Sequence, residues 1–324
     1  MSDFISTLGL EQSNVSNLTS GQAALNLLNT QLATGKKSQN LADYSSSDAQ
    51  KLMNLGSSVA QRQGFLDASN NLKLRLTTYD ASLTGIEDIA AQATTASLSA
   101  TTYNPDTNGS FASQIKGCMQ QVNYYLNQKV GDRYIFAGSR FNSAPVGDIT
   151  ALPVPPTETA PYVSTGSALP SYDINFDPLN PNAQVPEAYV KDQVAVDTQQ
   201  KITYGVTSTQ AGFQQLVMGL RYAYAATQSQ ANYSTYMSTA HDLMTKGLAA
   251  IRGIHTDVAN ASTTLDQTEA LHNSTITDLK GQIDDIQKVD VNEVAVKITT
   301  YQSQLEASYA ATAKMINLSI LKYL

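Results

Sequence analysis

Residues 72–93 read LKLRLTTYDASLTGIEDIAAQA, and this stretch decides the fold class of the chain. Its apolar side chains recur at alternating intervals of four and three residues, at Leu72, Leu76, Tyr79, Leu83, Ile86, Ala90 and Ala93. Such alternation keeps them on one face of an α-helix over about three heptads. The stretch therefore predicts a long amphipathic helix whose apolar face packs against another helix.

Further stretches carry apolar side chains at the same intervals, and each predicts a helix. The first series is Val15, Leu18, Gln22, Leu25, Leu28 and Leu32. The next is Phe111, Ile115, Cys118, Val122 and Tyr125. Those toward the C-terminus are Met244, Leu248, Ile251, His255 and Val258, then Leu279, Ile283 and Ile286, and finally Val294, Ile298, Tyr301 and Leu305. If the last two series formed one helix from Ile283 to Leu324, it would be about 60 Å long.

Proline placement indicates where long helices can form. All ten prolines lie between Pro105 and Pro186, and nine of them lie from Pro145 onward. Proline in a helix interior costs ~3 kcal/mol because it removes a hydrogen bond and clashes with the preceding turn. Residues 1–104 and 187–324 can therefore be helical over long distances, whereas the middle of the chain cannot.

Two local signals predict helix ends in the N-terminal part. Gly35 follows Thr34 and precedes a pair of lysines, which suits the C-terminus of the first helix. Residues 104–106, Asn-Pro-Asp, form a strong turn signal after the long helix. We therefore expect one helix to end near residue 34 and the next long one before residue 104.

The middle of the chain has the pattern of strands and loops. Residues 133–138 follow a Gly-Asp turn and predict a hairpin strand, and residues 202–206 alternate between apolar and polar side chains. Residues 145–190 are rich in Pro, Ser, Thr and Asn, which predicts a small β insertion with many loops. The predicted fold is mainly α: a helical rod or coiled coil built from the two flanks, with a β-hairpin and a β-rich, Pro-rich insertion.

These patterns predict three regions. Residues 1–40 and 285–324 would form a terminal coiled-coil core. Residues 41–144 and 205–284 would form a domain of long helices with the hairpin, and residues 145–204 an outer β-rich insertion.

Composition excludes several classes of function. The formal net charge is −7, which argues against a nucleic-acid partner and against docking on anionic membranes. No stretch approaches the ~18 apolar residues of a membrane span. Cys118 is the only cysteine, so an intrachain disulfide is impossible. Because residues 1–5 lack the features of a cleaved signal peptide, we expect any export to use another route.

The two ends of the chain lack charge. Residues 12–35 contain no charged side chain, and residues 305–324 contain only Glu306, Lys314 and Lys322. An isolated amphipathic helix in water normally has a charged outer face. We therefore expect the terminal helices to pair with each other and then with neighbouring subunits, and to be disordered in the isolated monomer.

The residues expected at this assembly surface are the apolar ones of both ends. They are Val15, Leu18, Leu25, Leu28, Leu32, Ile298, Tyr301, Leu305, Tyr309, Met315, Ile316, Leu318, Ile320 and Leu321. The alternative is that both terminal segments pack on the body of the same chain.

The sequence contains no catalytic or metal-binding motif. It lacks a phosphate-binding glycine loop, a Gly-x-Ser-x-Gly turn and paired Cys or His at metal-ligand spacing. His255 lies on an apolar series, where a packed or hydrogen-bonded role is expected, and Cys118 is expected to be a small buried side chain. Asp284 and Asp285 are adjacent and would point in different directions from a helix. We expect no enzyme activity, no cofactor and no metal.

Three motifs give the chain a family resemblance. Residues 28–37, LNTQLATGKK, resemble the end of the first helix in the flagellin superfamily. Residues 134–140, YIFAGSR, resemble the "YLFGG" strand of these proteins. Residues 304–309, QLEASY, and 315–324, MINLSILKYL, are similar to the "LQASY" and "M…SLFNYL" tail of the hook–filament junction proteins. The proline-rich middle has no counterpart.

The resemblance implies a hook-associated protein that is exported unfolded by the flagellar type III apparatus and is extracellular. It would assemble as a ring of identical copies between the first hook-associated protein and flagellin. A chaperone would cover the C-terminal helix before export. Residues 38–44, SQNLADY, depart from the family's "SPSDDP", so the turn after the first helix is expected to differ.

Two other functions stay open from the sequence. A flagellin that forms the filament itself would share the helical layout. A cytosolic coiled-coil binding module or chaperone would instead fold both termini stably in the monomer.

Overall fold

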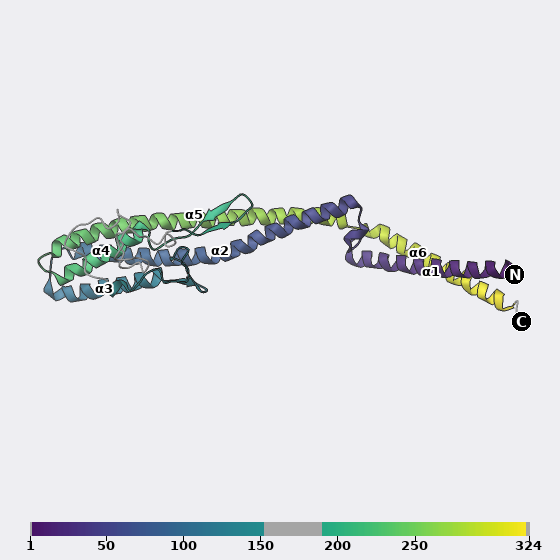
Figure 1. Cartoon of the computed structure of the whole chain (residues 1–324), viewed down its shortest axis with the longest axis horizontal. Helices are drawn as coiled ribbons and strands as arrows, with labels where there is room; N and C mark the ends of the chain where they lie inside the picture. Colours follow the sequence, from purple (N-terminus) through teal and green to yellow (C-terminus); the bar gives the residue numbers. More distant parts are fainter. Residues whose placement is uncertain (1, 152–189, 322–324) are drawn as a thin grey trace. The chain divides into compact units, whose positions relative to one another are not determined.

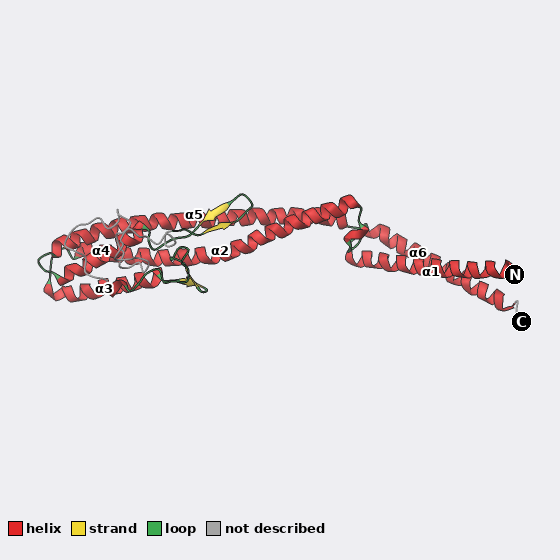
Figure 2. Cartoon of the chain, in the orientation of Figure 1, coloured by secondary structure: helices red, strands yellow, loops and turns green. Residues whose placement is uncertain are grey.

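The structure is a computed structural model that describes residues 2–151 and 190–321, and the side chains of residue 9 and of residues 12–151 and 190–314. Most of the predicted insertion, residues 152–189, lies outside the described residues. Six α-helices and two short antiparallel hairpins make up the described part (Figures 1 and 2). The prediction of a mainly α fold with small β elements is confirmed.

The helices account for most of the chain. They are α1 (Ser2–Thr34), α2 (Ser46–Ser99), α3 (Pro105–Leu126), α4 (Ala211–Gln228), α5 (Tyr233–Gln287) and α6 (Val291–Leu321). The hairpins are β1 (Lys129–Val130) with β2 (Arg133–Tyr134), and β3 (Gln193–Ala195) with β4 (Lys201–Thr203). Two short 3-10 turns, Leu41–Asp43 and Ile149–Ala151, complete the elements.

The chain divides into two compact units. The first comprises residues 1–61 and 274–324, and the second residues 62–273. The boundary falls inside α2 and inside α5, so each of these long helices contributes to both units. The three-region division expected from the sequence stays a prediction.

The predicted helix ends at Thr34 and at the Asn-Pro-Asp turn are confirmed. Gly35 takes a φ of 68°, the left-handed conformation that terminates helices and that glycine adopts without a steric penalty. At the start of α3, the Asn104 side chain accepts a hydrogen bond from the Asp106 N–H at 3.0 Å. Pro105 occupies the first helical position, where its missing N–H costs nothing.

The expected continuous helix from Ile283 to Leu324 is wrong, because the chain turns between α5 and α6. The break has a local cause at Asp290, whose side chain accepts hydrogen bonds from the N–H groups of Asn292 and Glu293 at 2.9 and 3.2 Å. A short acidic side chain that caps two free N–H groups starts a new helix in place of continuing the old one.

The predicted strand at residues 133–138 is shorter than expected. Only Arg133 and Tyr134 belong to β2, although the Ile135 N–H still donates across the hairpin to the Gln128 carbonyl at 3.1 Å. The Tyr134 N–H bonds to the Phe141 carbonyl at 2.8 Å, so the chain curls back on itself, and Gly138 turns with a φ of 63°.

The core of the second unit contains the apolar series of residues 72–93. All seven of its side chains are buried, and Leu83, Ile86, Ala90 and Ala93 are fully inaccessible. Phe136 and Phe213 complete this core with an edge-to-face contact at 5.7 Å between ring centroids. The predicted heptad face of α2 is therefore the centre of the unit.

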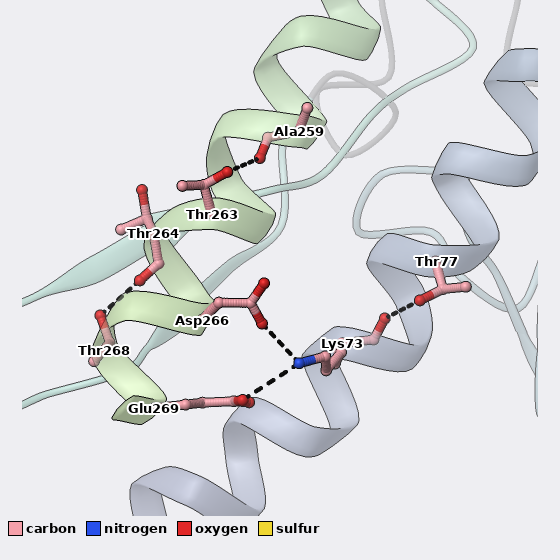
Figure 3. A network of polar contacts seen from close by, with 8 residues as sticks. All are labelled: Lys73, Thr77, Ala259, Thr263, Thr264, Asp266, Thr268 and Glu269. Carbon is pink, nitrogen blue, oxygen red and sulfur yellow. Dashed lines mark hydrogen bonds and ion pairs between the residues drawn. The ribbon is translucent and has the colours of Figure 1, made fainter. Parts of the chain in front are cut away.

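Within the second unit, α2 and α5 run antiparallel. Ser97 contacts His241, Glu87 contacts His255, and Lys73 contacts Asp266. The residue numbers of the partners therefore rise along α5 as they fall along α2. Figure 3 shows Lys73 of α2 between Asp266 and Glu269 of α5, at 2.6 and 3.5 Å. Polar contacts thus line the outside of an apolar seam.

Many hydroxyl side chains lie inside these helices without breaking them. Thr77, Thr263 and Thr268 each donate to the carbonyl four residues earlier, at 2.8 to 3.0 Å (Figure 3). A threonine that bonds its own helix needs no water and no external partner. The hydroxyl groups of these threonines are therefore satisfied within their own helices.

Candidate assembly surface on α1 and α6

Two helices of the first unit, α1 and α6, pack along one narrow apolar seam. Its buried centre consists of Leu28, Val294 and Ile298, and Leu25 and Tyr301 pack against them half-buried. Further along α1, Gly21 faces Leu305: a Cβ on that glycine would lie 3.0 Å from Leu305 Cδ2. Because Gly21 has no side chain, α1 and α6 can approach each other closely there, and the Leu305 side chain fills the space.

The contacts show that α1 and α6 are antiparallel. Leu28 meets Ile298, Gly21 meets Leu305, and the Gln22 side chain donates to the Tyr309 hydroxyl at 2.5 Å. The positions on α1 decrease as those on α6 increase, which confirms that the two ends of the chain lie side by side (Figure 1).

A short main-chain clip fixes the end of α1 to the turn between α5 and α6. The Lys37 N–H donates to the Gln287 carbonyl at 2.7 Å, and the Val289 N–H donates to the Gly35 carbonyl at 3.0 Å. The Lys37 ammonium adds a bond to the Ile286 carbonyl at 2.9 Å. These bonds use main-chain groups that a continuous helix would need for itself, and so they hold the break open.

Both α1 and α6 expose apolar side chains outside the seam, and α6 also carries an exposed ion pair between Glu293 and Lys297. Leu27 is 52% exposed on α1, and Val296 is 67% exposed on α6. Leu27 directly precedes the buried Leu28, so its side chain points about 100° away around the helix and lies off the seam. In water an exposed apolar face with no charged rim on α1 favours association.

A shallow hollow of about 390 Å³ lies beside the clip. Leu27 and Thr30 of α1 line one side of it, and Lys36 and Lys37 line the other.

The structure brings some predicted site residues together and leaves others apart. Those in the seam are Leu25, Leu28, Ile298, Tyr301 and Leu305. Leu18 is half-buried, and Val15, Leu32 and Tyr309 are mostly exposed. The side chains of Met315, Ile316, Leu318, Ile320 and Leu321 lie outside the described residues.

Four residues of this surface were missed from the sequence. Gly21 and Val294 belong to the seam, and Leu27 and Val296 to the outward faces. Val294 already stood on an apolar series, so its spacing was the available signal. For Leu27 and Val296 the available signal was an apolar residue that lies off the series of buried positions.

The titratable groups described outside this surface make structural contacts. Among the described residues, no three His, Cys, Asp or Glu side chains are arranged to hold a metal ion. Burial raises the pKa of the Cys118 thiol and that of the Tyr79 hydroxyl, so both stay protonated and unreactive near neutral pH. Tyr79 donates its hydroxyl proton to the Ile135 carbonyl, which is a structural role.

His272 has a structural role as well. Its ring is fully buried, stacks on Phe65 at 5.6 Å, and has Nε2 at 2.7 Å from the Val196 carbonyl. A carbonyl only accepts, so Nε2 carries the proton and Nδ1 accepts from Arg62 at 3.0 Å. The ring thereby fastens the β3–β4 hairpin to α5 and α2.

None of the described helices combines the length and the apolar character that a membrane span requires.

Comparison with known proteins identifies structural relatives. No protein-family model matches the chain, and no curated protein matches it by sequence. Among solved structures, a protein from Vibrio parahaemolyticus described as a flagellar hook-associated protein superposes with a TM-score of 0.59. It is 13% identical and covers 76% of this chain and 100% of its own.

FlgL from Bacillus cereus superposes with a TM-score of 0.52 at 15% identity. The match covers 72% of this chain and 100% of FlgL. At such identities the likeness establishes the fold. The resemblance to hook-associated proteins that the sequence motifs indicated is confirmed at that level.

Proposed function

We propose that this chain is a structural subunit of the bacterial flagellum that forms the adaptor ring between hook and filament. The observation that carries the proposal is the α1–α6 pair, whose seam is narrow and whose outward faces expose Leu27 and Val296. Such faces suit a helix that is covered by neighbouring subunits. The fold shared with a flagellar hook-associated protein and with FlgL supports the same role.

Assembly would complete the burial of the two terminal helices. The inner seam, from Leu28 to Ile298, orders α1 against α6, and the outward faces then contact the α1 and α6 helices of neighbouring copies. Because ordering and contact occur together, part of the interface free energy is consumed in ordering the termini. The monomer would therefore hold its terminal helices loosely before it joins the ring.

The partners follow from this position in the flagellum. Copies of the same chain would form the ring, the first hook-associated protein would contact one side, and flagellin the other. Before export through the type III apparatus, a chaperone would cover α6, which includes Met315, Ile316, Leu318, Ile320 and Leu321. The role requires no catalysis, no cofactor and no metal.

Immunogold electron microscopy of intact cells tests the location. The antibody should be raised against residues 145–190, because this segment carries none of the motifs shared with flagellin. Label confined to the boundary between hook and filament is the expected result. Label along the whole filament would identify a flagellin, and label only inside the cell would favour a cytosolic coiled-coil module; both overturn the adaptor role.

Surface variants test the mechanism of assembly. Val296→Asp places a charge on the outward face of α6 without touching the seam, and Leu28→Asp disrupts the seam itself. Both should block incorporation into flagella while the second unit keeps its thermal transition. Leu98→Asp is the matched control, because Leu98 is 62% exposed on the part of α2 in the second unit. Normal incorporation of Val296→Asp would rule out the outward face as the interface.

A further inference from the structure

His255 of α5 lies between two carboxylates of α2 in the second unit. Its Nδ1 is 2.7 Å from Glu87 Oε1, and its Nε2 is 2.8 Å from Asp80 Oδ1. Carboxylate oxygens accept hydrogen bonds, so each ring nitrogen needs its own proton to make both contacts. Only the imidazolium form of His255 has two N–H donors, and only that form bridges the two carboxylates.

The two carboxylates differ in their surroundings. The Glu87 side chain is 20% exposed, and the Arg252 Nε lies 3.7 Å from its second oxygen. The Asp80 side chain is 62% exposed and has water available. Loss of a hydrogen bond costs more at the shielded Glu87 than at Asp80, because an exposed carboxylate exchanges its partner for water.

We propose that Asp80, His255 and Glu87 form a pH-sensitive latch between α2 and α5, closed by the imidazolium and opened first at Asp80 when the ring loses a proton. The neutral ring has a single N–H, which stays on Nδ1 to satisfy Glu87. Nε2 then presents a lone pair to Asp80 Oδ1, and two facing acceptors repel each other. Asp80 turns to solvent, and one cross-helix contact is lost.

The electrostatic surroundings set the pH range of the latch. Burial acts to lower the pKa of His255, but the hydrogen bonds and negative charges of Asp80 and Glu87 outweigh burial and raise it above its ordinary value. A folded-state pKa above the unfolded one stabilises the fold fully below about pH 6.5, and that contribution is lost as the pH rises through the folded pKa. The charged groups in contact with this cluster are Asp80 and Glu87 on α2 and Arg252 on α5.

A metal site does not explain this cluster. The two carboxylates lie at opposite nitrogens of one ring, so they cannot converge with it on a single cation. The other histidines differ from His255. His241 Nδ1 lies 3.1 Å from the Ser97 hydroxyl, and the nearest acceptor of His272 is the Val196 carbonyl. Only His255 is bracketed by two carboxylates among these three.

Urea unfolding of the full chain between pH 6 and pH 9 tests the latch. The midpoint of the wild-type transition should fall as the pH rises, and His255→Gln should remove that part of the fall, because glutamine does not titrate. His241→Gln is the matched control and should keep the wild-type pH dependence. If His255→Gln shows the same dependence as the wild type, there is no latch.

The order of opening has its own test. Asp80→Asn should remove more of the pH dependence than Glu87→Gln, since the Asp80 contact is the one that the neutral ring loses. An equal or larger loss in Glu87→Gln would overturn the order. Nitrogen-15 spectra of the His255 ring above the transition should show the proton on Nδ1, and a proton on Nε2 would also overturn it.

Discussion

The two units of the chain differ in how completely each one buries its own apolar side chains. In the second unit, Leu83, Ile86, Phe213 and Leu216 are fully inaccessible, and they belong to one continuous core that α2, α3, α4 and α5 share. In the first unit, the cluster between α1 and α6 is limited to Leu28, Val294 and Ile298 with a few half-buried neighbours. The second unit has the core of an independently folding domain, whereas the α1–α6 pair of the first unit has a single seam.

This difference in burial suggests that the second unit folds in the monomer, whereas the α1–α6 pair is completed by assembly. A helix pair with one narrow seam gains little from burial and still loses the conformational entropy of two long segments. The same apolar residues would gain far more if their outward neighbours, such as Leu27 and Val296, were also covered. We infer that the second unit supplies the stability of the monomer and that the first becomes stable in the assembled state.

The largest expected effect is in the core of the second unit. Leu83→Ala removes a fully buried side chain and leaves a cavity, which should lower the free energy of unfolding by about 2–5 kcal/mol. Urea unfolding followed by circular dichroism measures this loss. Leu305→Ala, at an equally apolar position of the first unit, should leave the main transition almost unchanged. Similar losses for both variants would show that the two units unfold as one.

Glycine packing between α4 and α5 gives the next largest effect. A Cβ on Gly247 would lie 2.7 Å from the Leu216 main-chain nitrogen, so Gly247→Ala forces the two helices apart. We expect a loss of about 1–3 kcal/mol in the free energy of unfolding, measured as above.

Gly253 offers the matched control on the same helix. No atom lies within 4 Å of a Cβ at this exposed position, so Gly253→Ala should stabilise the helix by about 0.5–1 kcal/mol. A destabilising Gly253→Ala would mean that a packing partner covers this face of α5, and a neutral Gly247→Ala would mean that α4 shifts at no cost.

Much of the fold could be predicted because helix periodicity and helix ends are local properties. The series from Leu72 to Ala93 specifies one buried face by its spacing alone, and Gly35 and Asn104 specify ends through their own conformations. The break before α6 was missed although Asp290 and Glu293 stand three residues apart, the spacing of a capping pair. Apolar residues at helical spacing both before and after Asp290 favoured the interpretation as one continuous helix.

The candidate site was only partly predictable, because a series of apolar residues does not show how many faces of a helix are covered. Leu28 and Ile298 lie buried in the seam, whereas Val15 and Leu32 belong to the same series as Leu28 and are exposed. Whether a position on a series is buried depends on the side chain opposite to it on the other helix. For α1 that side chain comes from a segment almost the whole chain away, such as Leu305 opposite Gly21.

The smallest expected effect lies at the polar border of the α2–α5 seam, where Lys73 bridges Asp266 and Glu269 (Figure 3). The Lys73 and Asp266 side chains are 50% and 55% exposed, so water and salt screen their contact, whereas Glu269 is 16% exposed and its longer contact is screened less. Lys73→Met should therefore lower the free energy of unfolding by less than about 1 kcal/mol, and the loss should shrink at high salt. Lys246→Met, which breaks a pair with Asp242 inside α5, is the control and should cost still less, because that pair joins no second helix. A loss at Lys73 that does not change with salt would mean that its aliphatic stem, and not its charge, holds α2 against α5.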